Sequence, residues 1–298
     1  MNEACRKAPQ NDAPNVNIPI GSVGIDHYKT PIRLIFGRKH FDSTAEISAS
    51  VDLPLNMRGA HLSKIIIPVI SEIGRSDEDT FKLVNRISRL ILESNAYSSK
   101  ALLKLSTQYL RELHGPDDLK SYAPYLIEYS SESRQGGMML NCIMLETTIF
   151  TACPCTMEGS RSILAERFPE HSAFLASIPA VTHNQRNRLA VTISNYKSYN
   201  PDPDEIIESI ESVTGKPLSA IRTERETDKF VLEAHESPRF VEDVVRDVAR
   251  AICREIENLE DSAIIKITSR SEESLHNHDA YAEIELTAGE IRKYSRNQ

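Results

Sequence analysis

The sequence predicts an α+β protein built from two similar units in tandem. Three observations lead to this fold class. Short stretches alternate apolar and polar residues as half-buried strands do, and longer stretches repeat apolar residues at helical spacing. The order strand, helix, helix, strand, strand also occurs in both halves, which indicates a duplicated unit. We expect a disordered arm at residues 1–19, a first unit at 20–135 and a second unit at 136–298.

In the first half, the strand signal is clearest where "AEISASVDL" alternates in polarity and Pro54 ends the pattern. A helix is predicted where Phe81, Val84 and Ile87 recur behind acidic residues. The segment at 99–113 fits both periods, because its leucines alternate and also follow a helix. The predicted elements are a strand at 45–53, helices at 61–74 and 77–95, the ambiguous segment at 99–113, and strands at 121–130 and 137–150.

The second half repeats these signals. Gly215 closes one predicted helix, and a long amphipathic pattern predicts another. The expected elements are a strand at 188–198, helices at 202–215 and 237–259, and strands at 262–271 and 280–287.

The composition is that of an ordinary globular protein. Hydrophobic residues make up 40% of the 298 residues and charged residues 26%, and the net charge is −8. An acidic balance argues against nucleic-acid binding through a basic face. The first residues lack the apolar core of a signal peptide, and no run approaches a membrane span. Together with five cysteines, an odd number, this predicts a cytoplasmic protein in a reducing compartment.

The stretch "TACPCTMEG" places Cys153 and Cys155 one proline apart. Metal knuckles use two intervening residues, and a rigid Pro154 makes shared coordination or a mutual disulfide awkward. One sulfur is therefore expected to bind a metal while the other has a different role. The other cysteines are interpreted as a tail residue or small buried hydrophobes, namely Cys5, Cys142 and Cys253.

Other candidate ligands lie in separate short segments of the sequence. They are His183 in "THNQR", the acidic run at 224–229, and His276 with His278, whose i,i+2 spacing on a strand would send both rings to one face. A thiolate, an imidazole and a carboxylate together suit Zn(II) or Fe(II), with an open position for water. Glu242 lies near a helix N-terminus, and periodicity alone would interpret it as a solvated carboxylate.

Five motifs occur in order: "VDLPLNMRGAHLSK", "ACPCT", "THNQR", "DKFVLEAHESPRFVEDVVRDVA" and "ESLHNHDAYAE". Over roughly residues 20–290 they resemble the type IB GTP cyclohydrolases, which open the imidazole ring of GTP in pterin biosynthesis. The resemblance implies tandem tunnelling-fold units (ββααββ), with antiparallel sheets and helices on one face. It makes residues 99–113 a strand, and it implies a homo-oligomer with sites at interfaces between units.

The resemblance also assigns roles to residues. Cys153 resembles the metal-binding thiolate, and His183 and His276 resemble the metal-proximal imidazoles, while Cys155 matches a thiol beside the purine. The family's carboxylate ligand is represented by Asp228, one methylene shorter. Glu242 matches the glutamate that anchors guanine, and the further substrate-binding residues are His61, Ser63, Lys64 and Arg186. Lys64 stands where the family more often has arginine. A lysine can contact a phosphate, but it cannot make the two parallel hydrogen bonds that an arginine guanidinium makes.

The expected activity is metal-dependent hydrolysis of GTP with release of formate, using Fe(II), with Mn(II) or Zn(II) as alternatives. Such an ion lowers the pKa of bound water towards about 7 and supplies hydroxide for attack at C8. The "TACPCTMEG" stretch and the long insert before "THNQR" favour the methanopterin-type branch, whose product is 7,8-dihydroneopterin 2′,3′-cyclic phosphate with diphosphate. The alternative product is 7,8-dihydroneopterin triphosphate. The alternative from a different functional class is a non-catalytic protein with the tunnelling fold. The presence of two thiols, two histidines and a glutamate argues against this alternative, namely Cys153, Cys155, His183, His276 and Glu242.

Overall fold

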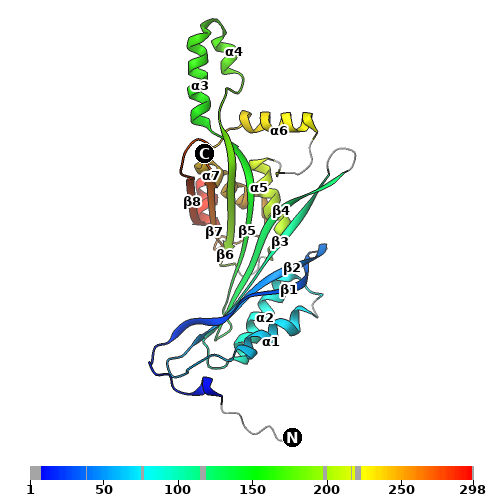
Figure 1. The fold of residues 1–298 in the computed structure, drawn as a ribbon, viewed down its shortest axis with the longest axis vertical. Coiled ribbons are helices and arrows are strands. Elements are labelled where there is room, and N and C mark those ends of the chain that lie inside the picture. Colours follow the sequence, from blue (N-terminus) through cyan, green and yellow to red (C-terminus); the bar gives the residue numbers. More distant parts are fainter. Residues whose placement is uncertain are drawn as a thin grey trace. The chain divides into compact units, whose positions relative to one another are not determined.

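The computed structural model describes residues 8–37, 39–74, 77–114, 119–196, 200–215, 217–218 and 223–296. It is an α+β fold in which eight strands follow one another in chain order within one sheet (Figure 1). The β1–β2, β2–β3, β6–β7 and β7–β8 pairs are antiparallel. Two compact units emerge, one of residues 1–108 and 127–143, the other of residues 109–126 and 144–298.

The strands are β1 (Ile20–Phe36), β2 (Lys39–Leu53), β3 (Lys100–His114), β4 (Lys120–Arg134), β5 (Met139–Ala152), β6 (Asn184–Ser194), β7 (Ile264–Ser271) and β8 (Ala280–Thr287). The α-helices are α1 (Leu62–Ile73), α2 (Thr80–Ser94), α3 (Pro154–Arg167), α4 (Ser172–Ala176), α5 (Pro203–Thr214), α6 (Glu224–Glu236), α7 (Val241–Glu255) and α8 (Ala288–Ser295). Short 3₁₀ turns occur at Pro9–Asn11 and Pro169–His171.

This order contains ββααββ twice. The first copy is β1-β2-α1-α2-β3-β4, and the second is β5-β6-α5-α7-β7-β8 with α3, α4 and α6 inserted. The duplicated order predicted from the sequence is therefore confirmed, and residues 99–113 do form a strand.

In the first unit, α1 and α2 contact β1 and β2. Alternate side chains of β2, such as Ile47 and Val51, are buried, and Ile87 and Ile91 on α2 are fully buried as well. The alternating apolar residues of β2 and the helically spaced apolar residues of α2 thus pack into one core. Asp79 caps α2 by accepting hydrogen bonds from the backbone N–H groups of Phe81 and Lys82.

In the second unit, α7 packs on α5, β7 and β8. Its inward face is almost continuous, with the side chains of Val244, Val248 and Ile252 buried. They meet the buried residues of β7, whose pattern alternates strictly. This packing fixes where the first turn of α7 lies relative to the ends of the strands.

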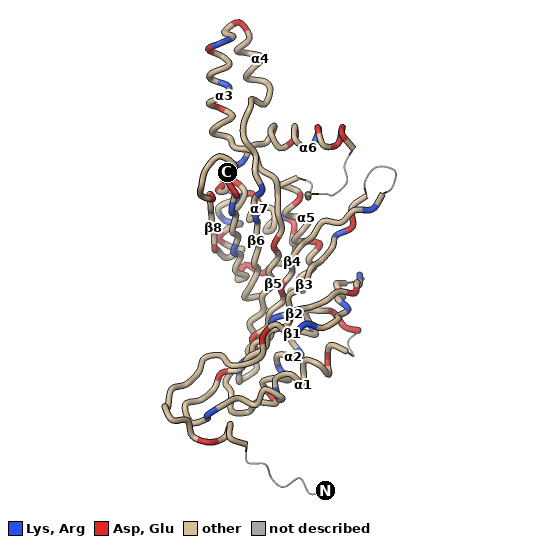
Figure 2. The backbone as a smooth tube through the Cα atoms, in the orientation of Figure 1, with Lys and Arg blue, Asp and Glu red and all other residues tan. Residues whose placement is uncertain are grey.

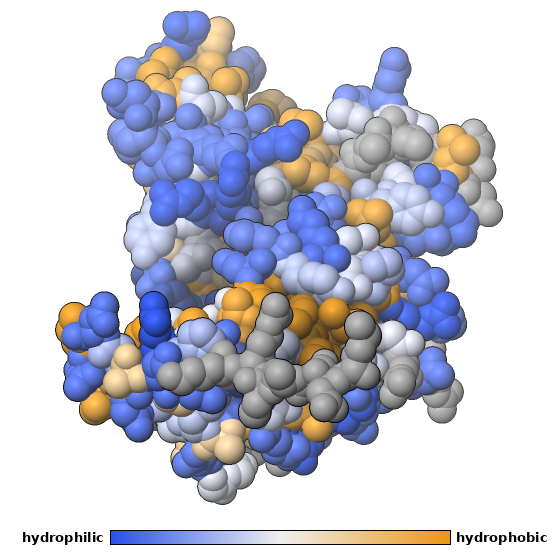
Figure 3. Space-filling model, turned by 60° about the horizontal axis from the view of Figure 1, so that its bottom comes forward, coloured by the Kyte–Doolittle hydropathy of each residue, from blue (hydrophilic) through white to orange (hydrophobic). Residues whose placement is uncertain are grey.

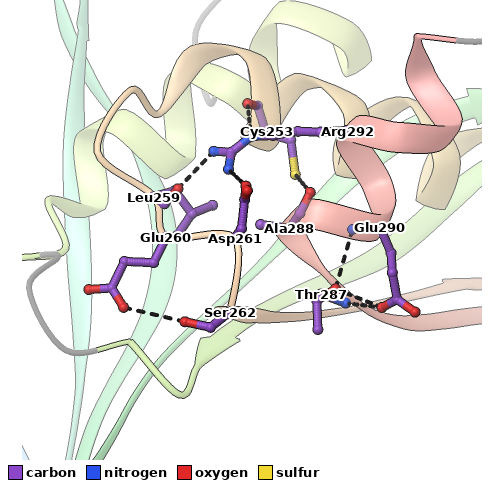
Figure 4. Close-up of polar contacts among 9 residues, drawn as sticks. All are labelled: Cys253, Leu259, Glu260, Asp261, Ser262, Thr287, Ala288, Glu290 and Arg292. Carbon is purple, nitrogen blue, oxygen red and sulfur yellow. Dashed lines mark hydrogen bonds and ion pairs between the residues drawn. The ribbon is translucent and has the colours of Figure 1, made fainter.

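The C-terminal helix α8 is attached to the end of α7 by one arginine (Figure 4). The guanidinium of Arg292 donates to the carbonyl oxygens of Leu259 at 2.8 Å and Cys253 at 3.4 Å, and it pairs with Asp261. Thr287 and Glu290 form a capping box at the start of α8. The last turn of α7, the following loop and α8 are therefore held together by charge-assisted bonds.

Acidic and basic residues are interspersed along the described chain (Figure 2). Figure 3 shows a mainly hydrophilic face on which hydrophobic side chains gather in patches. Exposed apolar residues of the second unit include Ile163, Phe168 and Phe174 around α3 and α4. Across the described ranges, no helix is both long and apolar enough to span a membrane.

Several elements were not predicted: β1, α3, α4, α6 and α8. Helix α6 buries no residue and α3 buries only Met157, so neither carries the apolar stripe on which periodicity depends. Strand β6 begins at Asn184, earlier than the predicted residue 188, because polar side chains occupy its first inward positions. Residues 1–7 of the predicted arm, with Cys5, lie outside the described residues.

Candidate active site

The two neighbouring thiols lie at the start of α3 in different surroundings. Cys153 is the N-cap, and Pro154 occupies the first helical position, where its missing N–H is not needed. Cys153 is half-buried and lines a pocket, whereas Cys155 is exposed. The residues predicted to have separate roles therefore differ in access to solvent, although which sulfur binds a metal stays a prediction.

Cys153 and His183 are brought together by the backbone. The N–H of Cys153 donates to the carbonyl oxygen of His183 at 3.1 Å, and the hydroxyl of Thr182 donates to the carbonyl oxygen of Cys153 at 2.7 Å. The chain thus leaves the sheet after β5, forms α3 and α4, and returns to the same place (Figure 1).

The His183 side chain is only 10% exposed, and its ring lies close to an acidic side chain. Its Nδ1 lies 3.8 Å from Oε2 of Glu273, whose side chain is 11% exposed, and 3.4 Å from the hydroxyl of Ser274. Glu273 lies two residues after the end of β7, so the segment that leaves this strand places the carboxylate beside the imidazole. Sequence reasoning did not single out Glu273, although it is the first residue of the "ESLHNHDAYAE" motif.

A pocket of about 200 Å³ is lined by residues at the ends of six elements of the second unit, namely β5, α3, β6, α7, β7 and β8. Cys153 and Glu242 both line it, although they are far apart in sequence. Glu242 is exposed and lies in the first turn of α7, where the helix dipole favours a negative charge. The full lining is Thr151, Cys153, Pro154, Gln185, Arg239, Phe240, Val241, Glu242, Ser271, Glu273, Ala280 and Tyr281.

His276 and His278 lie in the segment between β7 and β8 and not on a strand, so that part of the prediction is wrong. The mostly polar residues before Ala280, ending with Asp279, lack the apolar and polar alternation that would extend β8. The two rings nevertheless face each other, with centroids 5.1 Å apart and an interplanar angle of 18°. Both histidines are exposed.

The remaining predicted site residues occupy separate places. Asp228 is exposed on α6, and Arg186 is exposed on β6. In the first unit, His61 caps α1, and its Nε2 lies 2.9 Å from Oδ1 of Asn11. Ser63 and Lys64 are exposed in the first turn of that helix.

The metal donors are only partly assembled. Cys153, His183 and Glu273 supply the sulfur, nitrogen and oxygen chemistry that Zn(II) or Fe(II) accepts. Within the described residues, however, no three His, Cys, Asp or Glu side chains are close enough to hold one ion. The donor chemistry fits a metal, while the donor geometry within one chain does not complete a site.

Sequence reasoning missed several pocket residues besides Glu273, chiefly Gln185, Ser271 and Arg239. Gln185 and Ser271 take inward positions on β6 and β7 where the alternating pattern calls for apolar side chains. Polar residues at such positions were the signal that could have identified them.

The profile of the family described as "Type I GTP cyclohydrolase folE2" matches residues 8–282. The chain therefore belongs to the type I GTP cyclohydrolase family, and the prediction of a GTP cyclohydrolase enzyme is confirmed. It is 34% identical to "GTP cyclohydrolase MptA" of Thermoplasma acidophilum, covering 95% of this chain and 96% of that protein. It is 29% identical to "GTP cyclohydrolase MptA 2" of Methanocella arvoryzae, covering 93% and 94%.

Among solved structures, the fold resembles uricase from Arthrobacter globiformis, with a TM-score of 0.55 and 9% identity. The match covers 89% of this chain and 93% of the uricase. At this identity the likeness concerns the fold alone, and it confirms the predicted tunnelling fold.

Proposed function

We propose that this GTP cyclohydrolase converts GTP into formate, 7,8-dihydroneopterin 2′,3′-cyclic phosphate and diphosphate. The observation that carries the proposal is the pocket shared by Cys153 and Glu242. The α3–α4 insertion before His183 supports the cyclic phosphate, because it is the feature that separates this sequence from the shorter spacing expected of the triphosphate-forming enzymes. The triphosphate, 7,8-dihydroneopterin triphosphate, is the alternative product.

Guanine recognition is assigned to Glu242. A carboxylate offers two acceptor oxygens to N1–H and the exocyclic amine of guanine, a donor pair that adenine does not present. Cys153, which lines the same pocket, and His183, whose carbonyl oxygen accepts a hydrogen bond from the Cys153 N–H, are proposed to lie beside the imidazole ring of the base. His183 and His276 are proposed to move protons as the C8–N9 bond breaks, with Cys155 beside the purine.

We further propose Fe(II) as the metal, with Mn(II) or Zn(II) as substitutes. Cys153 and His183 would hold it, and His276 and Asp228 remain the proposed additional ligands. The chemistry that the ion supplies is a hydroxide at neutral pH. The donor set is incomplete within the described residues, and this supports a homo-oligomer in which sites lie at interfaces. A cytoplasmic location also stays a prediction.

Mass spectrometry of the products formed anaerobically from GTP with Fe(II), Mn(II) or Zn(II) tests the reaction. A cyclic phosphate with free diphosphate is expected, and a triphosphate product would establish the alternative. Metal analysis of two variants tests the ligands: Cys153→Ala should lose metal, while Cys155→Ala should keep metal and lose turnover. Equal metal loss in both variants would contradict the division of roles.

A further inference from the structure

Two polar side chains of the pocket, Gln185 and Ser271, are buried, and each has an oxygen atom without a hydrogen-bond partner among the described residues. Gln185 is 9% exposed and Ser271 is 2% exposed. Among the residues that the structure describes, Oε1 of Gln185 and Oγ of Ser271 have no hydrogen-bond partner. Leaving a buried polar atom unpaired costs about 1–3 kcal/mol, so two in one pocket require an explanation.

The sheet places both side chains on the same wall. Asn187 is paired with Ser271 in the β6–β7 ladder, and the N–H of Glu272 donates to the carbonyl oxygen of Arg186 at 2.9 Å, so the pairing continues beyond β7. Gln185 lies two residues before Asn187 and therefore faces the same side of the sheet. Both side chains line the pocket next to Glu273.

Deeper in the sheet, two polar side chains of the same wall are hydrogen-bonded to each other. The hydroxyl of Ser269 donates to Oδ1 of Asn187 at 3.0 Å, and both residues are fully buried. Neither residue lines the pocket, and Nδ2 of Asn187 has no hydrogen-bond partner among the described residues, so this wall carries unpaired polar atoms both beside the pocket and next to it. Pocket-lining polar atoms that lack hydrogen-bond partners are the pattern expected of a site that binds a polar ligand.

The other walls indicate what kind of ligand fits. Pro154, Val241 and Tyr281 supply apolar and aromatic surface, and Glu242 supplies an anionic acceptor from α7. A volume of about 200 Å³ is below the roughly 300 Å³ at which pockets begin to enclose drug-sized molecules. The pocket therefore suits a flat heterocyclic base and not a whole nucleotide.

We propose that Gln185 and Ser271 are positioning residues that hydrogen-bond the purine base of the substrate from the wall opposite Glu242. Glu242 would read the N1–H and amine edge, and the Gln185–Ser271 pair would hold the remaining edge, fixing the ring in its plane. This inference rests on the proposed function, since it takes GTP as the ligand.

The experiment combines steady-state kinetics on GTP and inosine triphosphate with thermal unfolding of the unliganded protein. Ser271→Ala and Gln185→Met remove the polar atoms at nearly constant volume. Each is expected to raise KM for GTP about 3- to 10-fold, and the double variant about 10- to 100-fold, with a smaller effect on kcat. The ratio of kcat/KM for GTP to that for inosine triphosphate should not change, because the amine edge belongs to Glu242.

A structural role for the same atoms predicts different results. If the hydroxyl and amide oxygen only stabilise the fold, Tm falls and KM stays within twofold of wild type. If they serve the ligand, Tm of the free protein stays constant or rises, because an unpaired buried group has been removed. The matched control is Ser209→Ala, which changes a fully buried serine of the same unit outside the pocket and should leave KM unchanged.

The two proposals fail in distinguishable ways. Wild-type protein that does not turn over GTP would refute the proposed function, and the inference with it, before any variant is compared. Normal wild-type turnover with KM unchanged in both single variants and in the double variant would overturn the inference alone.

Discussion

The role of Glu242 can be tested by Glu242→Gln, which keeps the shape of the side chain and removes its charge. Glu242 lines the pocket from the first turn of α7, and Val241 is the other residue of this helix that lines it. The substitution turns one acceptor oxygen into a donor that faces a donor of guanine. Hydrogen bonds to a charged group contribute about 1.5–3 kcal/mol each, so losing two should lower kcat/KM by about two to four orders of magnitude.

The fold should change little in this variant. Removing a negative charge from a helix N-terminus costs about 0.3–1 kcal/mol, and the buried face of α7 is untouched. Asp243→Asn is the matched control, because Asp243 carries the same charge on the next residue and does not line the pocket. Its carboxylate accepts from the N–H of Phe240 at 3.1 Å and caps the helix, so this control should lose some stability and keep its kcat/KM.

The assay is steady-state turnover of GTP by wild type and both variants, together with thermal unfolding. A Glu242→Gln enzyme within about threefold of wild type would refute the assignment and return Glu242 to the role of a solvated helix carboxylate. Equal losses in both variants would show that charge at the helix terminus, and not guanine recognition, is responsible.

Three further outcomes are expected. Iodoacetamide at pH 8 should label exposed Cys155 well before Cys253, because burial raises the pKa of the Cys253 thiol to about 11; mass spectrometry of peptides locates the label. Arg292→Met should lower the free energy of unfolding by about 1–3 kcal/mol in urea titrations, since the carbonyl oxygens it bonds lose a charged donor. The pKa of Asp52 is lowered, since hydrogen bonds from Ser99 and neighbouring N–H groups outweigh burial, which acts in the opposite direction. Its contribution to stability is therefore present above about pH 3.9 and lost as pH falls through the lower folded-state pKa, so Asp52→Asn should be less stable than wild type at pH 7, and the difference should shrink as the pH falls below about 3.9.

Much of the fold could be predicted because its core elements carry strong periodic patterns. The α7 segment and strand β2 show the helical and alternating periods almost without interruption. Helix α6 could not be found in this way, because a helix that buries nothing has no reason to keep an apolar stripe. The segment at 99–113 could be settled only by resemblance, since leucine suits both periods.

The site was predicted less completely. Motif resemblance identified Cys153 and Glu242, and the structure places both in one pocket. The i,i+2 spacing of His276 and His278 was interpreted as that of a strand, whereas the chain has already left the sheet there. Ser271 carries no motif of its own; its inward position on β7 marks it as unusual, and the register between β6 and β7 places it beside the pocket. Contacts made across strands are invisible to any reading of local sequence.

The chain returns to its point of departure, where the Cys153 N–H meets the His183 carbonyl, and this makes the part of the excursion beyond Cys155 modular. Both ends are fixed by the sheet, so the cost of closing this loop depends only slowly on its length. The helices α3 and α4 touch each other and bury little of their surface. Evolution or protein engineering could therefore shorten, lengthen or exchange this part of the excursion while Cys153 and His183 keep their spacing, and the position is a natural place to graft a new binding module beside the candidate site.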